Sequence, residues 1–525
     1  MQSPLAQSRR LVLPELTGRA CRSRPDCPAV IFGDDVRTHA QLHDRAARLA
    51  SVLAAAGVGP RDRVAVLLHN RIEFVEALLA CHHLAAVAVP INFRLAADEV
   101  DYVLSDSGAM ALICDAPVPR ADEVRFVLSV GSDSSGYEDA VGADSSSYED
   151  AVRSAVPSDR AEVGEDDPAL MCYTSGTTGR PKGAVLTHRN LVASTLSWIH
   201  EMRAGEDDVW LSGQALFHIG GINGLLPFLV LGATVIITPT TAFDPDAMLG
   251  LIEAHGVTMC IFVPTQWALI CASDALARID RRRLRVAMWG ASSSPRRTLE
   301  AMEASFPNAA IVSAYGQTEM SGATTLLKGP DSTRKMGSVG KPMLGVELRV
   351  VDDELHDVPP GGVGEVVYRG PNVMAGYHQQ PDANREVFAG DWFHSGDLAR
   401  LDDEGYLWLV DRKKDMIVSG GENVYPAEVE RVLLEHPGVA EAAVIGVPHP
   451  HWVETPVAFV VPGGAGELDG LTEDELIGHC RRYLAGYKKP SAIVVVPELP
   501  RNAGGKVLKR RLRETYGDPF SATVE

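Results

Sequence analysis

The sequence predicts an α/β fold with two domains, a large N-terminal one over residues 1–411 and a small C-terminal one over residues 412–525. The 525 residues exceed what one hydrophobic core usually supports, so at least two domains are expected. Apolar runs alternate with helical patterns over most of the first part, which indicates parallel-rich sheets with covering helices. Two later changes of pattern predict a small β-rich subdomain and then a small α+β domain.

The strand–helix alternation is clearest in the first 115 residues. Apolar residues recur at helical spacing over residues 38–56 and again over residues 72–80. Between and after these helices, apolar runs predict buried strands over residues 63–68, 85–90 and 110–114. This order is typical of parallel strands joined by helices.

Residues 131–167 are rich in Ser, Asp, Glu and Gly. They contain a tandem repeat, DSSGYEDAV at 133–141 and DSSSYEDAV at 144–152. The composition predicts a solvated surface loop with a local duplication, and we assign the repeat no function.

A second α/β stretch covers residues 190–310, and the pattern changes after it. Strands are expected over 235–238 and 259–263, and helices over 246–254 and 266–272. Residues 339–409 read as short strands and tight turns, which predicts the β-rich subdomain. In the last part, helices are expected over 426–436 and 473–484 and strands over 441–446, 457–461 and 492–496.

Composition excludes several classes of function. The net charge of −20 argues against broad nucleic-acid binding and against attraction to anionic membranes. The N-terminus lacks the apolar core of a signal peptide, and Pro227 and Gly232 interrupt the longest apolar stretch, residues 224–237. None of the eight cysteines forms a CxxC pair, so free thiols are expected. We therefore expect a cytoplasmic protein with no transmembrane segment; its oligomeric state is left open, a homodimer included.

The most informative segment is YTSGTTGRPKG at residues 173–183. It follows one apolar run and precedes another, which places a Gly- and hydroxyl-rich loop after a strand. Glycine lets backbone N–H groups converge on an anion, hydroxyls donate further hydrogen bonds, and Lys182 adds a compact positive charge. Lys182 is also the first lysine of the chain. The segment is not a Walker A loop, because no Gly-Lys-Ser/Thr occurs in it; it predicts a polyphosphate cradle, with a flexible surface loop as the alternative.

Further strings along the chain carry a resemblance to one family. They are AYGQTE at 314–319, WFHSGDL at 392–398, DRKKDMIVSGGENVY at 411–425 and PRNAGGK at 500–506. Together with the phosphate loop, they resemble the adenylate-forming superfamily, which includes acyl-CoA synthetases, aryl-CoA ligases, firefly luciferase and peptide-synthetase adenylation domains. The resemblance implies an AMP-forming acid–CoA ligase that uses ATP, Mg²⁺ and coenzyme A. A small-molecule carboxylic acid and ATP give an acyl adenylate and pyrophosphate, and coenzyme A then takes the acyl group.

The resemblance also implies site residues for the nucleotide and coenzyme A. Tyr315 would pack on adenine, Thr318 would contact the α-phosphate and Glu319 would hold Mg²⁺. Asp397 would accept hydrogen bonds from both ribose hydroxyls. The full set implied for ATP and coenzyme A is Thr174, Ser175, Gly176, Thr177, Thr178, Gly179, Lys182, Gly290, Ala291, Ser292, Tyr315, Gly316, Gln317, Thr318, Asp397, Arg412, Gly420, Gly421 and Trp452.

The implied catalytic residues are Lys506, Glu319, Thr174, His218 and Lys414. Lys506 matches the lysine that offsets the repulsion between carboxylate and α-phosphate during adenylation. Lys414 falls at the hinge about which the mobile small domain rotates. That rotation would replace Lys506 at the site by Gly420 and Gly421, so that coenzyme A can reach the adenylate.

The acid is less well defined. The implied substrate residues are His218, Gly220, Gly221, Trp289, Gly316 and Met320. His218 stands where amino-acid-activating relatives carry Asp, which argues against an amino acid. Gly316 replaces the tryptophan that closes the pocket in acetate-activating relatives, whereas Trp289 replaces a glycine and either narrows the pocket or turns into the core.

The predicted pocket segments hold no arginine to pair a second carboxylate, which disfavours dicarboxylic acids. The string KDMIVSGGENVYPAEVE, at residues 414–430, looks most like bacterial fatty-acyl-CoA ligases, so a medium- or long-chain fatty acid is the first expectation. An aryl-CoA ligase of the benzoate or cinnamate type is the first alternative. An acyl-AMP ligase that loads a carrier protein, a non-catalytic ATP-binding homologue and a luciferase-like oxygenase also stay open.

Overall fold

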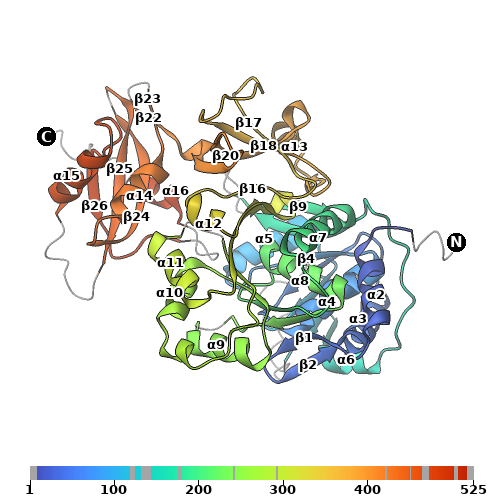
Figure 1. The fold of residues 1–525 in the computed structure, drawn as a ribbon. Coiled ribbons are helices and arrows are strands. Elements are labelled where there is room, and N and C mark those ends of the chain that lie inside the picture. Colours follow the sequence, from blue (N-terminus) through green and yellow to red (C-terminus); the bar gives the residue numbers. More distant parts are fainter. Residues whose placement is uncertain are drawn as a thin grey trace. The chain divides into compact units, whose positions relative to one another are not determined.

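The computed structural model describes residues 9–116, 118, 124–131, 144–174, 180–240, 243–290, 294–419, 422–449, 451–463, 472–501 and 507–516 (Figure 1). Two compact units make up the chain. The first comprises Met1–Leu348 with Tyr368–Phe393, and the second comprises Arg349–Val367 with His394–Glu525. Both units mix helices and strands, so the predicted α/β class is confirmed.

The first unit contains two large sheets. One has the order β16-β15-β14-β13-β12-β10-β11-β1-β2 and the other β19-β9-β8-β4-β3-β5-β6-β7. Their strands are β1 Pro28–Phe32, β2 Asp35–Thr38, β3 Arg63–Leu67, β4 Val87–Pro90, β5 Ala111–Cys114, β6 Phe126–Ser129, β7 Asp144–Ser147, β8 Pro168–Thr174, β9 Lys182–Thr187, β10 Val209–Ser212, β11 Thr234–Ile237, β12 Met259–Phe262, β13 Val286–Gly290, β14 Ala310–Gln317, β15 Gly322–Lys328, β16 Lys341–Pro342 and β19 Gly376–Tyr377.

Parallel pairing dominates the centre of both sheets, as the strand–helix alternation predicts. Strands β1, β11, β10, β12, β13 and β14 pair in parallel, and so do β8, β4, β3, β5, β6 and β7. Antiparallel pairs are confined to the edges, where β2, β15, β16, β9 and β19 lie. Strands β4 and β5 are buried along their whole length because helices or the other elements cover both faces.

The helices of the first unit include four, α3, α4, α9 and α10, that follow the predicted segments to within a few residues, and the unit contains further helices. In chain order, all of them are α2 Leu13–Ser23, α3 His39–Ala55, α4 Ile72–Leu84, α5 Ala97–Ser107, α6 Tyr148–Ser154, α7 His188–Met202, α8 Ile219–Leu231, α9 Pro245–Ala254, α10 Pro264–Ala272, α11 Arg296–Ser305, α12 Asp331–Arg334 and α13 Pro381–Val387. A capping box between Thr38 and Gln41 fixes the start of α3. The apolar stretch 224–237 divides at Gly232, whose φ of 75° ends α8 before β11 begins.

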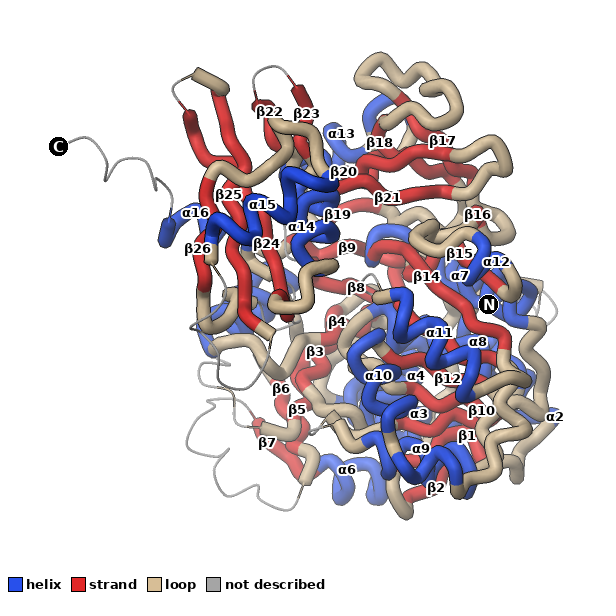
Figure 2. The backbone as a smooth tube through the Cα atoms, turned by 60° about the vertical axis from the view of Figure 1, so that its left-hand side comes forward, coloured by secondary structure: helices blue, strands red, loops and turns tan. Residues whose placement is uncertain are grey.

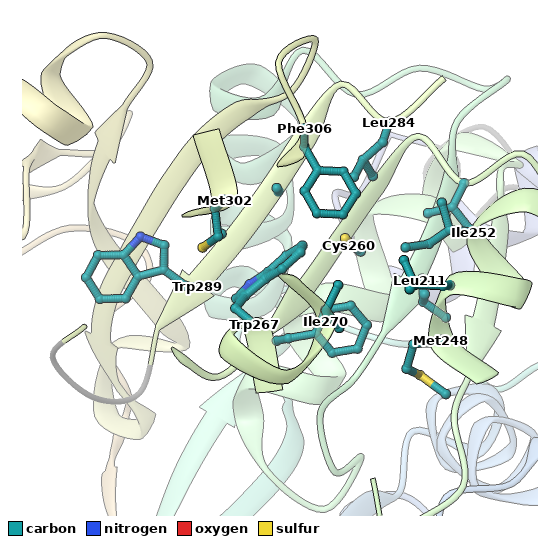
Figure 3. Packing of buried hydrophobic residues seen from close by; sticks show 14 of the residues in the cluster. Leu211, Met248, Ile252, Cys260, Trp267, Ile270, Leu284, Trp289, Met302 and Phe306 are labelled. Atoms are coloured by element: carbon teal, nitrogen blue, oxygen red, sulfur yellow. The ribbon is translucent and has the colours of Figure 1, made fainter. Parts of the chain in front are cut away.

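A large apolar core lies between the nine-stranded sheet and helices α9, α10 and α11 (Figure 3). Trp267 is fully buried within it, and its indole nitrogen donates a 2.6 Å hydrogen bond to the carbonyl of Met288. Side chains of successive residues on β13 point to opposite faces, so Ala287 and Trp289 join this core while Met288 does not.

The second copy of the tandem repeat is not a surface loop, contrary to the prediction. Residues 144–152 form β7 and most of α6, and Tyr148 has no exposed surface. Its hydroxyl donates a 2.7 Å hydrogen bond to Glu76, a fully buried carboxylate of α4 that also pairs with Arg45 at 2.6 Å. A buried charge needs such partners, and supplying one explains why Tyr148 of this polar segment is buried. The first copy lies outside the described residues.

The second unit holds most of the sheet β17-β18-β20-β21 and a five-stranded sheet in the order β23-β22-β25-β24, with β26 parallel to β25 (Figure 2). Its strands are β17 Glu347–Val351, β18 Gly364–Arg369, β20 Phe393–Leu401, β21 Leu407–Arg412, β22 Ile417–Ser419, β23 Glu422–Val424, β24 Val439–His449, β25 Val453–Pro462 and β26 Ala492–Val495. Helices α14 Pro426–Leu434, α15 Glu473–Tyr483 and α16 Lys509–Tyr516 pack on the second sheet. The predicted β-rich and α+β segments are therefore both present.

Across the described ranges, none of the helices combines the length and the apolar character that a membrane crossing requires. The eight cysteines are free thiols; five are buried and Cys21, Cys27 and Cys271 are partly exposed. Burial raises the pKa of Cys81 and of Cys172 to about 12, which leaves these two thiols protonated and unreactive at neutral pH.

Candidate active site

The phosphate-loop segment connects two antiparallel strands of the first unit. Strands β8 and β9 pair so that Thr174 lies opposite Lys182. The predicted ligands Ser175, Gly176, Thr177, Thr178 and Gly179 lie outside the described residues. The hairpin nevertheless places the hydroxyl of Thr174 and the ammonium group of Lys182 at the two ends of the loop.

Tyrosines anchor the described flanks of this loop. The hydroxyl of Tyr102, on α5, donates a 3.0 Å hydrogen bond to the carbonyl of Pro181, and the guanidinium of Arg180 lies 5.3 Å from the Tyr102 ring. The hydroxyl of Tyr173 donates a 2.6 Å hydrogen bond to Asp106. Burial, followed by this carboxylate, raises the pKa of Tyr173 well above its ordinary value, so the phenol stays a donor.

Glu319 lies in a short helical turn, Thr318–Met320, directly after β14. Its oxygen Oε1 accepts a 3.3 Å hydrogen bond from the hydroxyl of Thr174 and a 2.9 Å hydrogen bond from the hydroxyl of Tyr377. The Nζ atom of Lys182 lies 5.2 Å from the centre of the Tyr377 ring. These contacts bring the predicted residues Thr174, Lys182 and Glu319 together at one place in the first unit.

The oxygen atoms near Glu319 are suited to a Mg²⁺ ion that takes its remaining ligands from the nucleotide, because they are too few to hold a metal ion alone. One half-buried carboxylate and the hydroxyl of Thr174 provide hard oxygen atoms. Among the residues that the structure describes, no three His, Cys, Asp or Glu side chains gather as a metal cluster. Mg²⁺ in nucleotide sites is usually held by one or two carboxylates and the phosphates of the substrate, which matches this arrangement.

Tyr315, Gly316 and Gln317 form the end of β14, next to Glu319. The register with β15 shifts between Tyr315 and Gly316, and a Cβ atom on Gly316 would lie 1.9 Å from the carbonyl oxygen of Gly322. Position 316 therefore requires glycine because two strands approach closely there, irrespective of the size of the acid.

Gly290 ends β13, where a Cβ atom would lie 2.9 Å from the carbonyl oxygen of Ala314. Its neighbours Ala291 and Ser292, predicted beside adenine, lie outside the described residues. Trp289 is only 8% exposed and belongs to the apolar core, at the margin of the residues labelled in Figure 3. Of the two orientations left open for Trp289, the structure has the one that turns into the core.

His218 occupies the N-cap position of α8, where its side chain makes no capping hydrogen bond, and the residue is exposed. Desolvation lowers the pKa of His218 to about 4, and the positive charge of Arg94 acts in the same direction. Ring centres of Phe217 and His218 lie 4.3 Å apart, and Phe93 lies 5.3 Å from Phe217. His218 is thus a neutral imidazole at neutral pH, next to a row of aromatic rings that sequence reasoning missed. An aromatic pair separated by more than a hundred residues leaves no local signal.

Glycines near His218 have packing roles. A Cβ atom on Gly220 would lie 2.9 Å from the Gln214 side chain, and one on Gly221 would lie 2.3 Å from the carbonyl oxygen of Ala215. Protein atoms occupy the space that a side chain at either position would need. Glycine therefore allows the first turn of α8 to pack against residues 214 and 215. Met320, the remaining predicted substrate residue, is fully buried.

The second unit carries the residues predicted for ribose and for the hinge. Asp397 on β20 is directly opposite Arg412 on β21, and the two side chains form a 2.6 Å ion pair. Lys414 lies in the turn after β21, exposed to solvent. Trp452 is 54% exposed, which leaves its indole available to a ligand. Gly420, Gly421 and Lys506 lie outside the described residues, and so their predicted roles stay predictions.

The first unit has two large sheets covered by helices, and Glu319 lies beside the hairpin that carries the phosphate loop. These features are those of ATP-using, adenylate-forming enzymes. Residues 18–378 match the family model of AMP-binding enzymes, and residues 428–506 match the model of the AMP-binding enzyme C-terminal domain. This chain belongs to the AMP-binding enzyme family.

Relatives of known name are similar to the chain over almost its whole length. A feruloyl-CoA synthase of Amycolatopsis sp is 41% identical over 507 residues, which cover 95% of this chain and 98% of the relative. An indoleacetate–CoA ligase of Aromatoleum aromaticum is 39% identical over 519 residues, covering 96% and 98%. The long-chain-fatty-acid–CoA ligase FadD13 of Mycobacterium tuberculosis is 38% identical over 492 residues, covering 93% and 94%.

Among solved structures, the o-succinylbenzoate–CoA synthetase of Bacillus subtilis in complex with ATP and magnesium superposes with a TM-score of 0.82. It is 33% identical and covers 95% of this chain and 99% of its own. With these relatives, the predicted activity is confirmed at the level of reaction: the chain is an AMP-forming acid–thiol ligase that uses ATP, Mg²⁺ and coenzyme A.

Proposed function

We propose that the acid activated by this ligase is aromatic, with the carboxyl group on the ring or on a short side chain. The observation that carries the proposal is the similarity, along almost the entire chain, to ligases named for ferulate and for indoleacetate. The fatty-acid expectation, drawn from the string at residues 414–430, is supported less well, by FadD13 at 38% identity. The row of rings formed by Phe93, Phe217 and His218 is compatible with a flat substrate.

In this proposal the first unit binds ATP and magnesium for the first half-reaction. Lys182 and the hydroxyl of Thr174 bind the phosphates of ATP, and Glu319 holds the magnesium ion, which neutralises phosphate charge when bound. The neutral ring of His218 borders the acid's carboxylate without adding a second positive charge. Lys506 bridges carboxylate and α-phosphate in the transition state.

The second half-reaction depends on residues 412–525, which we propose act as a mobile lid. Rotation about Lys414 withdraws Lys506 and brings Gly420 and Gly421 to the adenylate, while Trp452 contacts coenzyme A on its way in. An exchange of this kind keeps water away from the reactive adenylate between the two steps.

The test is pyrophosphate release from ATP with a panel of acids, each with and without coenzyme A. The panel contains acetate, fatty acids of increasing length, benzoate, ferulate, cinnamate and indoleacetate. We expect release with aromatic acids and thioester formation only when coenzyme A is present. Preference for a long fatty acid by tenfold or more in kcat/KM would contradict the aromatic proposal, and release without any thioester would favour transfer to a carrier protein.

A further inference from the structure

Tyr377 is held in a fixed position by its own backbone. It lies on β19, where it pairs with Ala184 of β9. Its backbone N–H donates a 2.7 Å hydrogen bond to Oδ1 of Asn384, and the Asn384 side-chain nitrogen donates a 3.0 Å hydrogen bond to the Tyr377 carbonyl. Both hydrogen bonds fix the backbone of Tyr377, and a side chain on a fixed backbone can hold neighbouring groups in place.

The side chain of Tyr377 lies between two groups of the nucleotide site. Its hydroxyl donates a 2.9 Å hydrogen bond to Oε1 of Glu319, the same oxygen that accepts from Thr174 at 3.3 Å. Its ring faces the ammonium group of Lys182 at 5.2 Å. Two donors on one oxygen restrict rotation of the carboxylate, and the ring attracts the lysine by a cation–π interaction.

We propose that Tyr377 is a positioning residue of the nucleotide site: its hydroxyl orients the Glu319 carboxylate toward Mg²⁺, and its ring places the Lys182 ammonium group toward phosphate. The inference rests on the proposed roles of Glu319 and Lys182. Hydrogen-bond partners of a metal-binding carboxylate commonly change metal affinity by about 10–100-fold when they are removed. The two functions of Tyr377 are separable, because phenylalanine keeps the ring and loses the hydroxyl.

The experiment measures ATP binding to the full-length enzyme by calorimetry without any acid, so that no turnover occurs. MgCl₂ is titrated at fixed ATP, and ATP is titrated separately in EDTA. Tyr377→Phe is expected to raise the half-saturating Mg²⁺ concentration about tenfold and to leave ATP binding in EDTA unchanged. Tyr377→Leu, which also loses the ring, is expected to weaken ATP binding in EDTA by about twofold to fivefold.

Tyr148→Phe is the matched control. It removes a hydrogen bond of the same type, from a tyrosine hydroxyl to Glu76, at a buried position where no ligand is predicted. It should leave the Mg²⁺ titration unchanged. Asn384→Ala is a second variant, which releases the backbone of Tyr377 without removing the hydroxyl and should shift the Mg²⁺ titration in the same direction by a smaller factor.

Glu319→Gln distinguishes a failure of the proposed role of Tyr377 from a failure of the proposed metal site. A Mg²⁺ titration that responds to Glu319→Gln, but to neither Tyr377→Phe nor Asn384→Ala, would overturn the role of Tyr377 and leave the proposed metal site intact. A titration unchanged in all of these variants would overturn the metal site itself. A shift in Tyr377→Phe together with an unchanged Tyr148→Phe supports the inference.

Discussion

Arg412 and Asp397 face each other across two antiparallel strands and form a 2.6 Å ion pair. Asp397 is only 4% exposed, so the arginine offsets the cost of keeping its carboxylate charged. A carboxylate can accept two hydrogen bonds from a vicinal diol at once. Asp397 is proposed to bind the ribose hydroxyls, and the pairing with Arg412 on the next strand is compatible with that role.

The first prediction concerns Asp397→Asn. The amide keeps the shape but loses one acceptor and the charge, and hydrogen bonds to charged groups contribute about 1.5–3 kcal/mol. We expect the KM for ATP to rise about tenfold to a hundredfold. Comparing ATP with 2′-deoxy-ATP gives the decisive measurement: the native enzyme should prefer ATP, whereas the variant should lose most of that preference. An unchanged preference would remove Asp397 from the ribose site.

The second prediction concerns pH and the buried imidazoles of His82 and His188, whose ring centres lie 5.3 Å apart. Burial lowers the pKa of His188 to about 3 and that of His82 well below its ordinary value. Their folded-state pKa values are below the unfolded value of about 6.5, so the unfolded chain binds more protons between these limits. Stability should therefore fall as the pH is lowered from 6.5 toward 3.

Replacing His188 by leucine should flatten this dependence. Between pH 6.5 and 5 one such histidine contributes about 2 kcal/mol to the loss of unfolding free energy. Urea unfolding at pH 7 and at pH 5 measures the difference, and His200→Gln, an exposed position on the same helix, is the control. If His188→Leu lost as much stability on acidification as the native protein, the imidazole of His188 would not be responsible.

The third prediction concerns Gly316. A Cβ atom there would lie 1.9 Å from the carbonyl oxygen of Gly322, so even alanine forces two strands apart. We expect Gly316→Ala to lower the unfolding free energy by about 1–3 kcal/mol, the usual cost of overpacking. Gly250→Ala is the matched control, because its Cβ would meet nothing within 4 Å and it lies inside helix α9. Alanine there should be neutral or stabilising by up to about 1 kcal/mol.

The elements that could be predicted from the sequence are those whose signal is local. The apolar spacing of residues 38–56 and 72–80 is enough to predict α3 and α4, because a helix buries one face whatever it packs against. The phosphate loop and the string around Glu319 are contiguous motifs of the same kind. The two ends of the phosphate loop, Thr174 and Lys182, lie together because one hairpin joins them.

What could not be predicted depends on contacts between distant segments. The polar composition of residues 144–152 predicts a loop, because the sequence does not show that Tyr148 donates a hydrogen bond to the buried Glu76. Tyr377 reaches Glu319 only because β19 pairs with β9, and its two-residue strand leaves no pattern. The direction of Trp289 follows from which face of β13 it occupies, and a single bulky residue at a strand end does not determine that face.

The fourth prediction separates the two half-reactions through Lys506. Loss of one charge that acts on a developing transition state commonly costs about 10²–10³ in rate, so Lys506→Ala should lower acid-dependent pyrophosphate release by that factor. Thioester formation from a supplied acyl adenylate and coenzyme A should stay within about twofold, because this lysine is proposed to leave the site before that step. Lys509→Gln, which removes a lysine paired with Glu430 at 2.9 Å, should change neither rate and controls for the loss of a nearby charge. Equal losses in both half-reactions would instead place Lys506 in binding common to the two steps, and the exchange of groups about Lys414 would lose its main support.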